Sequence, residues 1–187
     1  WAGWQQYVVT SLGNPARGGV AWVALDGTPC MAWGTADKLW LWRGGALFDI
    51  TPTDIDYVEG FVDTQAAIGW GEGGWGEGGW GGGFPIGIAN GGRARTWMLQ
   101  PWGEDLLANP RGGKIYHWAF DSGTPSPAVP VTDGPESCVG FFVTDDRHLV
   151  ALGASVGSDP SPLRIAWANR ETLDEWTLEG ILNADRG

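Results

Sequence analysis

The feature that most constrains this sequence is a short β-strand unit that occurs three times. Each copy contains four apolar runs of a few residues, separated by turn residues, and several runs carry an aromatic residue at alternate positions. The copies occupy residues 19–52, 94–132 and 138–180. A repeated unit of four antiparallel strands is typical of β-propeller blades, which are usually about 40 to 50 residues long.

The sequence therefore predicts an all-β chain, built as a β-propeller-like array of four-stranded antiparallel blades. A β-sandwich is the alternative because its strands alternate in the same manner, but a sandwich does not require the same unit three times. Three blades are fewer than a propeller usually has. We expect residues 1–18 to be an N-terminal strand segment that closes the propeller, and residues 181–187 to continue into missing chain. The alternative is that the ring is completed by neither residues 1–18 nor additional chain, but in a different way.

The aromatic residues are the expected core between blades. Trp22, Trp97 and Phe142 occupy one equivalent place in the first strand of the three copies. Burying one indole removes on the order of 200 Å² from water, a gain of at most about 5 kcal/mol. The expected core residues are Trp22, Trp33, Trp40, Trp42, Trp97, Tyr116, Trp118, Phe142, Trp167 and Trp176.

Residues 53–93 form a long Gly/Trp-rich inserted loop between the first and second copies, and tryptophan recurs in it every five residues. A period of five sends successive indoles to opposite faces of a strand, which excludes a regular one-sided strand. We expect an extended loop that contacts a neighbouring blade or subunit. A flexible linker and a carbohydrate-stacking loop are the alternatives. The expected contact residues are Trp70, Trp75, Trp80 and Phe84.

The charge balance excludes some classes of partner. The chain has 11 Lys and Arg against 22 Asp and Glu, a net charge of −11. A protein that grips a nucleic acid duplex needs clustered cations, so this function is not expected. No apolar run approaches the roughly 20 residues of a membrane-spanning helix, so we also expect no membrane-spanning segment.

The cysteines and histidines do not form a metal-binding pattern. Cys30 and Cys138 each begin an apolar run, which predicts buried thiols more than a disulfide or a reactive nucleophile. The two histidines lie far apart in the sequence, and no CxxC pair is present. We therefore expect no metal and no cofactor.

Two further patterns fit catalysis or metal binding only by letter. Residues 153–157 read GxSxG, but a nucleophile elbow needs a helix after the serine, and the following residues include Pro160 and Pro162. The acidic group Asp54, Asp56 and Glu59 lacks EF-hand spacing, which favours a solvated turn over a Ca²⁺ site. The chain is not expected to be an enzyme.

Several stretches resemble propeller-bearing virion proteins of tailed bacteriophages. They are residues 34–52, the aromatic-glycine repeat that follows them, residues 96–113, and residues 142–147 taken with 163–167 and 176–177. The resemblance covers about residues 19 to 180 and is carried by structural motifs without a catalytic signature.

This resemblance implies a virion localisation, as a nozzle or hub of the phage tail that forms an oligomeric ring around the DNA exit path. The implied partners are other tail proteins and copies of the chain itself, with DNA passing through the ring without specific binding. An acidic wall would repel phosphates and fit this role, although an ordinary solvated acidic surface explains the charge equally well. The alternative function is a carbohydrate-binding propeller that recognises a host receptor through exposed tryptophans.

Overall fold

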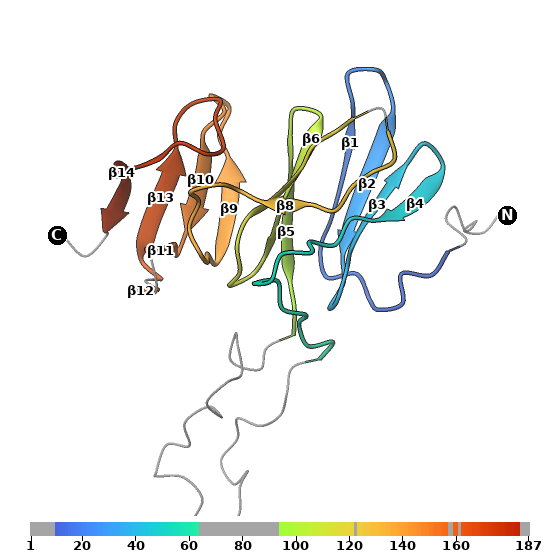
Figure 1. Cartoon of the computed structure of the whole chain (residues 1–187), viewed down its shortest axis with the longest axis horizontal. Coiled ribbons are helices and arrows are strands. Elements are labelled where there is room, and N and C mark those ends of the chain that lie inside the picture. The colour runs from blue at the N-terminus through green and yellow to red at the C-terminus, as the bar shows by residue number, and fades with distance from the viewer. Residues whose placement is uncertain (1–9, 64–93, 122, 157–158, 161, 184–187) are drawn as a thin grey trace, which may run out of the picture.

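A computed structural model of the chain describes residues 10–63, 94–121, 123–156, 159–160 and 162–183. Within these residues all regular structure is β and no helix forms (Figure 1). The strands make three four-stranded antiparallel sheets and one two-stranded ribbon. The predictions of an all-β chain and of four-stranded antiparallel sheets are therefore confirmed.

Sheet 1 is a meander of four strands in chain order, β1 (Gly19–Val23), β2 (Pro29–Gly34), β3 (Leu39–Arg43) and β4 (Ala46–Asp49). The connection between β3 and β4 has two residues, both glycines with positive φ, 58° and 86°. A two-residue hairpin that follows the twist of its strands needs positive φ at both positions, so the Gly-Gly pair determines this turn.

Sheet 2 has the same order, β5 (Trp97–Trp102), β6 (Asp105–Pro110), β7 (Tyr116–Trp118) and β8 (Val129–Pro130). The turn between β5 and β6 also begins with a glycine, Gly103, which has a φ of 67°. Each of these two sheets thus forms from local hairpins.

Sheet 3 contains β9 (Gly140–Val143), β10 (Leu149–Leu152), β13 (Arg164–Ala168) and β14 (Trp176–Asn183). A ribbon of β11 (Ser155–Val156) and β12 (Asp159–Pro160) is inserted between β10 and β13. The pairing order β9-β10-β13-β14 is again a meander once this ribbon is set aside.

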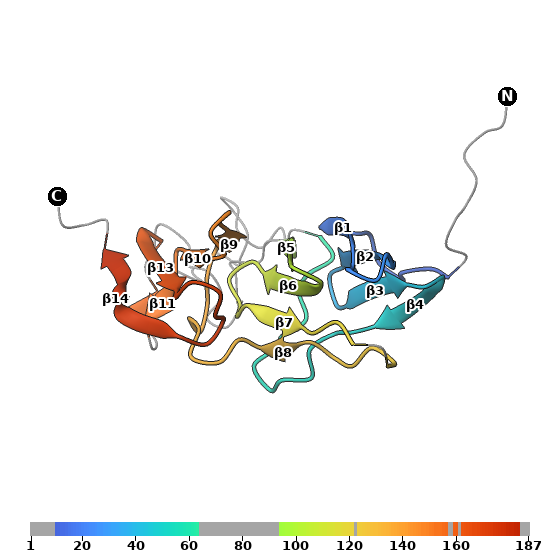
Figure 2. The ribbon, with the colours of Figure 1, turned by 90° about the horizontal axis from the view of Figure 1, so that it is seen from above.

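The three sheets stand side by side with sheet 2 in the middle (Figure 1). Figure 2 shows that their first strands, β1, β5 and β9, lie next to one another, and that the later strands of each sheet fan outward from them. Strand β5 is in contact with both β1 and β9. The described residues form an open fan.

Two hydrophobic cores hold the fan together, one on each face of sheet 2. In β6, Leu106 and Ala108 belong to the core shared with sheet 1, whereas Leu107 belongs to the core shared with sheet 3. Successive residues of a strand point to opposite faces, so a central strand is buried along its whole length. This explains why β6 has three apolar residues in a row, Leu106, Leu107 and Ala108, rather than an alternating pattern.

Close packing between sheets 1 and 2 depends on a glycine. The indole of Trp97 in β5 lies against Gly34 in β2, where an added Cβ would collide with the ring. The Trp97 Nε1–H donates a hydrogen bond of 2.6 Å to the carbonyl oxygen of Thr35. Any side chain at position 34 would therefore force the two sheets apart.

Half of the ten expected core aromatics are buried, four are partly buried, and one is exposed. Phe142 was expected in the core, but its side chain is 40% exposed, and the neighbouring Phe141 is fully buried instead. Phe141 belongs to the core with sheet 2, and Phe142 pairs with Val150 of β10 on the opposite face. Two adjacent phenylalanines in a strand point to opposite faces, and the sequence pattern does not show which of the two faces the core. Trp22, Trp42, Trp97, Tyr116 and Trp118 are buried, and Trp33, Trp40, Trp167 and Trp176 are partly buried.

The segments outside the three sheets bear on other predictions. Residues 10–18 of the expected N-terminal strand segment form no strand, and the earlier part of that segment lies outside the described residues. The isolated bridge between Phe61 and Ala94 brings the two sides of the insertion together. At the other end, β14 runs past residue 180 to Asn183.

Cys30 and Cys138 are free and buried, as predicted. Nowhere in the described ranges is there a helix that could cross a membrane.

Candidate functional site

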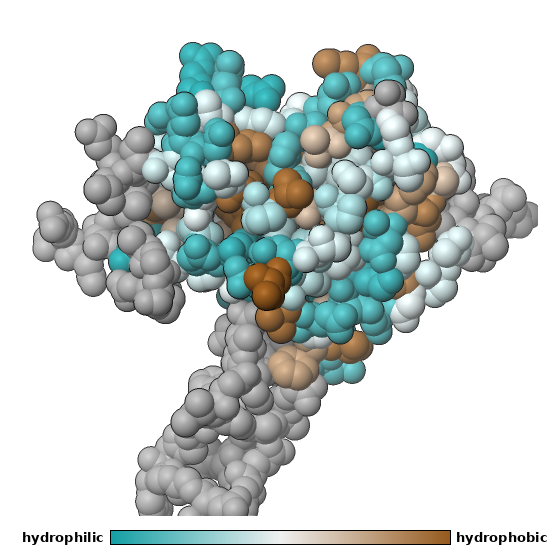
Figure 3. Space-filling model, in the orientation of Figure 1, coloured by the Kyte–Doolittle hydropathy of each residue, from teal (hydrophilic) through white to brown (hydrophobic). Residues whose placement is uncertain are grey.

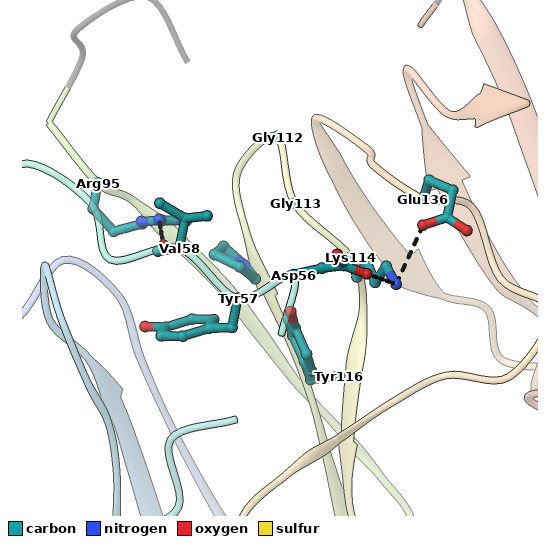
Figure 4. Close-up of a pocket in the computed structure, with 10 residues that line it drawn as sticks. Asp56, Tyr57, Val58, Arg95, Gly112, Gly113, Lys114, Tyr116 and Glu136 are labelled. Atoms are coloured by element: carbon teal, nitrogen blue, oxygen red, sulfur yellow. Dashed lines mark hydrogen bonds and ion pairs between the residues drawn. The ribbon is translucent and has the colours of Figure 1, made fainter. Parts of the chain in front are cut away.

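The candidate site is a pocket where the chain passes from sheet 1 to sheet 2. Its volume is about 320 Å³ (Figure 4). One side is the segment 51–61 that follows β4, which we call the linker segment. The other side is the turn between β6 and β7, with Arg95 near the start of β5 and Glu136 in the connection before β9.

Backbone and side-chain bonds hold the linker segment against both sheets. The Gly60 N–H donates to the carbonyl of Ala36 at 2.8 Å, and the Arg95 N–H donates to the carbonyl of Phe61 at 2.9 Å. The Tyr57 hydroxyl donates to the carbonyl of Asp37 at 2.9 Å. These bonds leave little freedom to the wall of the pocket that the linker segment provides.

Tyr57 also joins the pocket to the core. Its ring centroid lies 6.3 Å from that of Trp97 and 6.0 Å from that of Tyr116, in an edge-to-face arrangement with Tyr116. Such aromatic pairs add to the stabilisation from burial. Burial raises the pKa of the Tyr57 hydroxyl well above its usual range, so the group is neutral.

Two of the three acidic residues expected in a solvated turn, Asp54 and Asp56, also lie close to a lysine, and Glu136 joins them. Lys114 Nζ lies 2.7 Å from Asp56, 3.2 Å from Glu136 and 3.8 Å from Asp54. The hydrogen bond with Asp56 is the largest cause that raises the pKa of Lys114 above its ordinary value. Sequence reasoning missed this cluster because Lys114 and Asp56 are 58 positions apart.

Arg95 is the buried cation of the pocket, with only 7% of its surface exposed. Its guanidinium donates a hydrogen bond to the carbonyl of Val58, and it makes no ion pair with any carboxylate of the described residues. Gly60 packs directly on the side chain, where a Cβ would collide with Arg95 Nε. Burial lowers the pKa of Arg95, but a guanidinium stays protonated in any case. The pocket therefore contains a buried cation that forms no ion pair with a described carboxylate.

Tyr116 supplies a second polar group. The residue is 1% exposed, its hydroxyl end is directed toward the pocket in Figure 4, and within the described structure that hydroxyl has no hydrogen-bond partner. Burial raises the pKa of Tyr116 to about 12, so the group is an O–H donor at neutral pH. Tyr116 was expected in the core, and the residue both belongs to the core and lines the pocket.

The other motifs singled out in the sequence lie elsewhere. Ser155 of the GxSxG stretch lies in β11, and its hydroxyl accepts a hydrogen bond of 2.8 Å from the Ser137 N–H. His117 Nε2 lies 2.9 Å from Asp105 at the ends of β7 and β6. Burial by itself would raise the pKa of Asp105, but the bonds from His117 and from the Phe120 N–H outweigh burial and lower it.

The described ranges contain no group of three or more side chains able to hold a metal ion. The candidate contact residues Trp70, Trp75, Trp80 and Phe84 lie outside the described residues. The carbohydrate-binding alternative that depends on them therefore stays a hypothesis from sequence.

A second candidate site is formed by the sheet faces that point away from sheet 2. On the outer face of sheet 3, Phe142, Leu152 and Ile165 are 40%, 36% and 38% exposed. The partly buried Trp167 shares this face and pairs with Val150, as Phe142 does from the other side. On the outer face of sheet 1, the partly buried Trp33 and Trp40 are paired across β2 and β3, and Met31 and Leu47 share the face.

Comparisons with protein-family models, with curated proteins and with solved structures find no match for this chain.

Proposed function

We propose that this chain is a structural component of a bacteriophage tail, of nozzle or hub type, and not an enzyme. In this proposal the sheets are blades of a β-propeller-like array, and the array assembles into a ring around the DNA exit path. Its partners are copies of itself and other tail proteins. The tail assignment comes from the sequence resemblance, and the assembly role is supported by the geometry of the sheets.

The observation that carries the proposal is the chemistry of the two outer faces. Inside the fan, each pair of sheets is joined by aromatic and aliphatic side chains from both partners. The outer face of sheet 3 carries the same kinds of side chain and leaves Phe142, Leu152 and Ile165 exposed, whereas the tryptophans on the outer face of sheet 1 are buried or partly buried. Large apolar patches on a protein surface mark interaction sites. A further sheet of the same type is a partner that would fit each outer face.

The visible broad face of the molecule has a different character. In Figure 3 it is a mosaic of hydrophilic and neutral residues with separate apolar patches. The net charge of −11 supports a surface that DNA passes without binding, because phosphates are repelled by carboxylates. Stacking through the ends of the fan, and not through this broad face, is therefore the favoured mode of assembly.

Mass photometry and negative-stain electron microscopy of the chain test the assembly. The proposal predicts closed rings at micromolar concentration, and a double variant Phe142→Ser with Ile165→Ser reduces them to smaller species. Leu25→Ser is the matched control, since Leu25 is 91% exposed in the turn after β1 and lies on neither outer face. A wild-type chain that stays monomeric at every concentration contradicts the assembly role.

The tail assignment has its own test. Gold-labelled antibodies raised against the chain should decorate the tail of the phage that encodes it. Label on the capsid alone, or none on intact particles, contradicts the assignment.

A further inference from the structure

We propose that the pocket beside Arg95 binds a small carboxylate that also carries hydroxyl groups, such as a sugar acid. The proposal concerns a different surface from the outer faces of sheets 1 and 3, and it does not depend on the assembly role. Its argument rests on the buried guanidinium, the unpartnered Tyr116 hydroxyl and the carboxylates that border the same pocket.

The buried guanidinium of Arg95 would be stabilised by an anionic ligand. A buried charge is costly unless it is paired, and Arg95 donates a hydrogen bond to the carbonyl of Val58 and interacts electrostatically with the neutral Tyr57 and Tyr116. The other cation of the pocket, Lys114, is already shared by three carboxylates. An incoming anion would therefore pair with Arg95 rather than with Lys114.

The surrounding charges favour a carboxylate over a phosphate. Asp56 and Glu136 line the pocket, and the partly buried Asp54 lies 3.8 Å from Lys114 Nζ. A dianionic phosphate would be repelled by these groups more strongly than a carboxylate with a single negative charge. A planar carboxylate also matches the geometry of the guanidinium donors.

The remaining polar groups favour hydroxyls on the same ligand. The Tyr116 O–H has no hydrogen-bond partner among the described residues, and a ligand oxygen would satisfy it. Asp56 and Glu136 have side chains that are 57% and 62% exposed, so they are open to hydrogen bonds from ligand hydroxyls. The volume of about 320 Å³ is at the small end of ligand pockets, which span about 300 to 1,000 Å³. This size suits a molecule with one sugar ring.

Isothermal titration calorimetry of the full chain with D-glucuronate tests the proposal, and methyl glucoside is the matched neutral ligand. Glucuronate is expected to bind measurably and methyl glucoside at least about tenfold more weakly. Tyr116→Phe keeps the ring contact with Tyr57 and removes only the hydroxyl, so it should weaken glucuronate binding about fivefold. Arg95→Met should weaken it about a hundredfold, because a charged hydrogen-bonding partner is lost.

Arg170→Met is the control, because Arg170 has a side chain that is 67% exposed and does not line the pocket. It should leave the affinity unchanged. Absence of binding by glucuronate overturns the proposal, and so does equal binding of the two ligands. Glucuronate binding that Tyr116→Phe leaves unchanged places the ligand elsewhere and also overturns it, even where Arg95→Met fails to fold.

Discussion

Replacing Trp118 by alanine tests how the sheets are held together. Trp118 lies in β7, is 1% exposed and belongs to the core shared with sheet 1. Its ring meets Trp22 edge-on at 6.5 Å between centroids and Phe120 at 6.1 Å. The indole is therefore the contact through which β7 reaches the first strand of sheet 1.

The expected loss follows from this burial. A fully buried indole removes on the order of 200 to 250 Å² from water, worth about 5 to 6 kcal/mol at 25 cal/mol per Å². This figure is an upper bound because the unfolded chain is already partly compact. Alanine replacements of buried Phe and Trp cost about 3 to 5 kcal/mol. We therefore expect Trp118→Ala to lower the free energy of unfolding by about 4 kcal/mol.

Urea unfolding followed by far-UV circular dichroism measures this loss without relying on tryptophan fluorescence. A loss of about 4 kcal/mol corresponds to a melting temperature lower by about 8 to 16 °C for a domain of this size. Leu25→Ala, at a position that is 91% exposed, should change the stability by less than about 0.5 kcal/mol. A loss below about 1 kcal/mol for Trp118→Ala would refute its role as a core contact between sheets 1 and 2.

Three further predictions concern other parts of the fold. Phe141→Ala should lower the free energy of unfolding by about 3 to 5 kcal/mol and Phe142→Ala by less than about 1.5 kcal/mol in the isolated chain, because only Phe141 is fully buried. A larger loss for Phe142→Ala than for Phe141→Ala in urea unfolding would contradict the register of β9. Asp105→Asn should lower stability by about 1 to 2 kcal/mol at pH 7 and by much less at pH 2. Because the pKa of Asp105 is lower in the folded chain than its unfolded value of about 3.9, the ionised carboxylate stabilises the fold above that pH. This stabilisation is lost as the pH falls through the folded pKa. An equal loss of stability in Asp105→Asn at both pH values would argue against the interaction. The Cys138 thiol, whose pKa burial raises to about 12, should react with Ellman's reagent only after denaturation, and rapid reaction of the native protein would show that the thiol is accessible.

The local strands were predictable from the sequence because they depend on neighbouring residues. The Gly44–Gly45 pair sets a hairpin that few other residues would allow, and the apolar runs on either side have the period of a strand. The three four-stranded sheets follow from such hairpins repeated along the chain. The inner residue of the pair Phe141–Phe142 was not predictable, since it depends on which face of sheet 3 meets sheet 2.

The candidate pocket was hidden from the sequence for a different reason. Neither Arg95 nor Lys114 has a carboxylate within five positions of it in the chain. Asp56 meets Lys114 only because the linker segment crosses from sheet 1 to sheet 2. Arg95 follows the insertion, and the strand after it contains no carboxylate, so the sequence alone does not indicate a binding site there. The site becomes visible only when the fold brings the linker segment and the turn after β6 beside Arg95.

The most direct test of the account is a cryo-EM reconstruction of the assembled chain that resolves the surroundings of Phe142. The account predicts that a further four-stranded sheet packs against Phe142, Leu152 and Ile165 and continues the fan around a central axis. A map in which an assembled particle leaves this face in contact with solvent, and joins its subunits through the broad face instead, would contradict it.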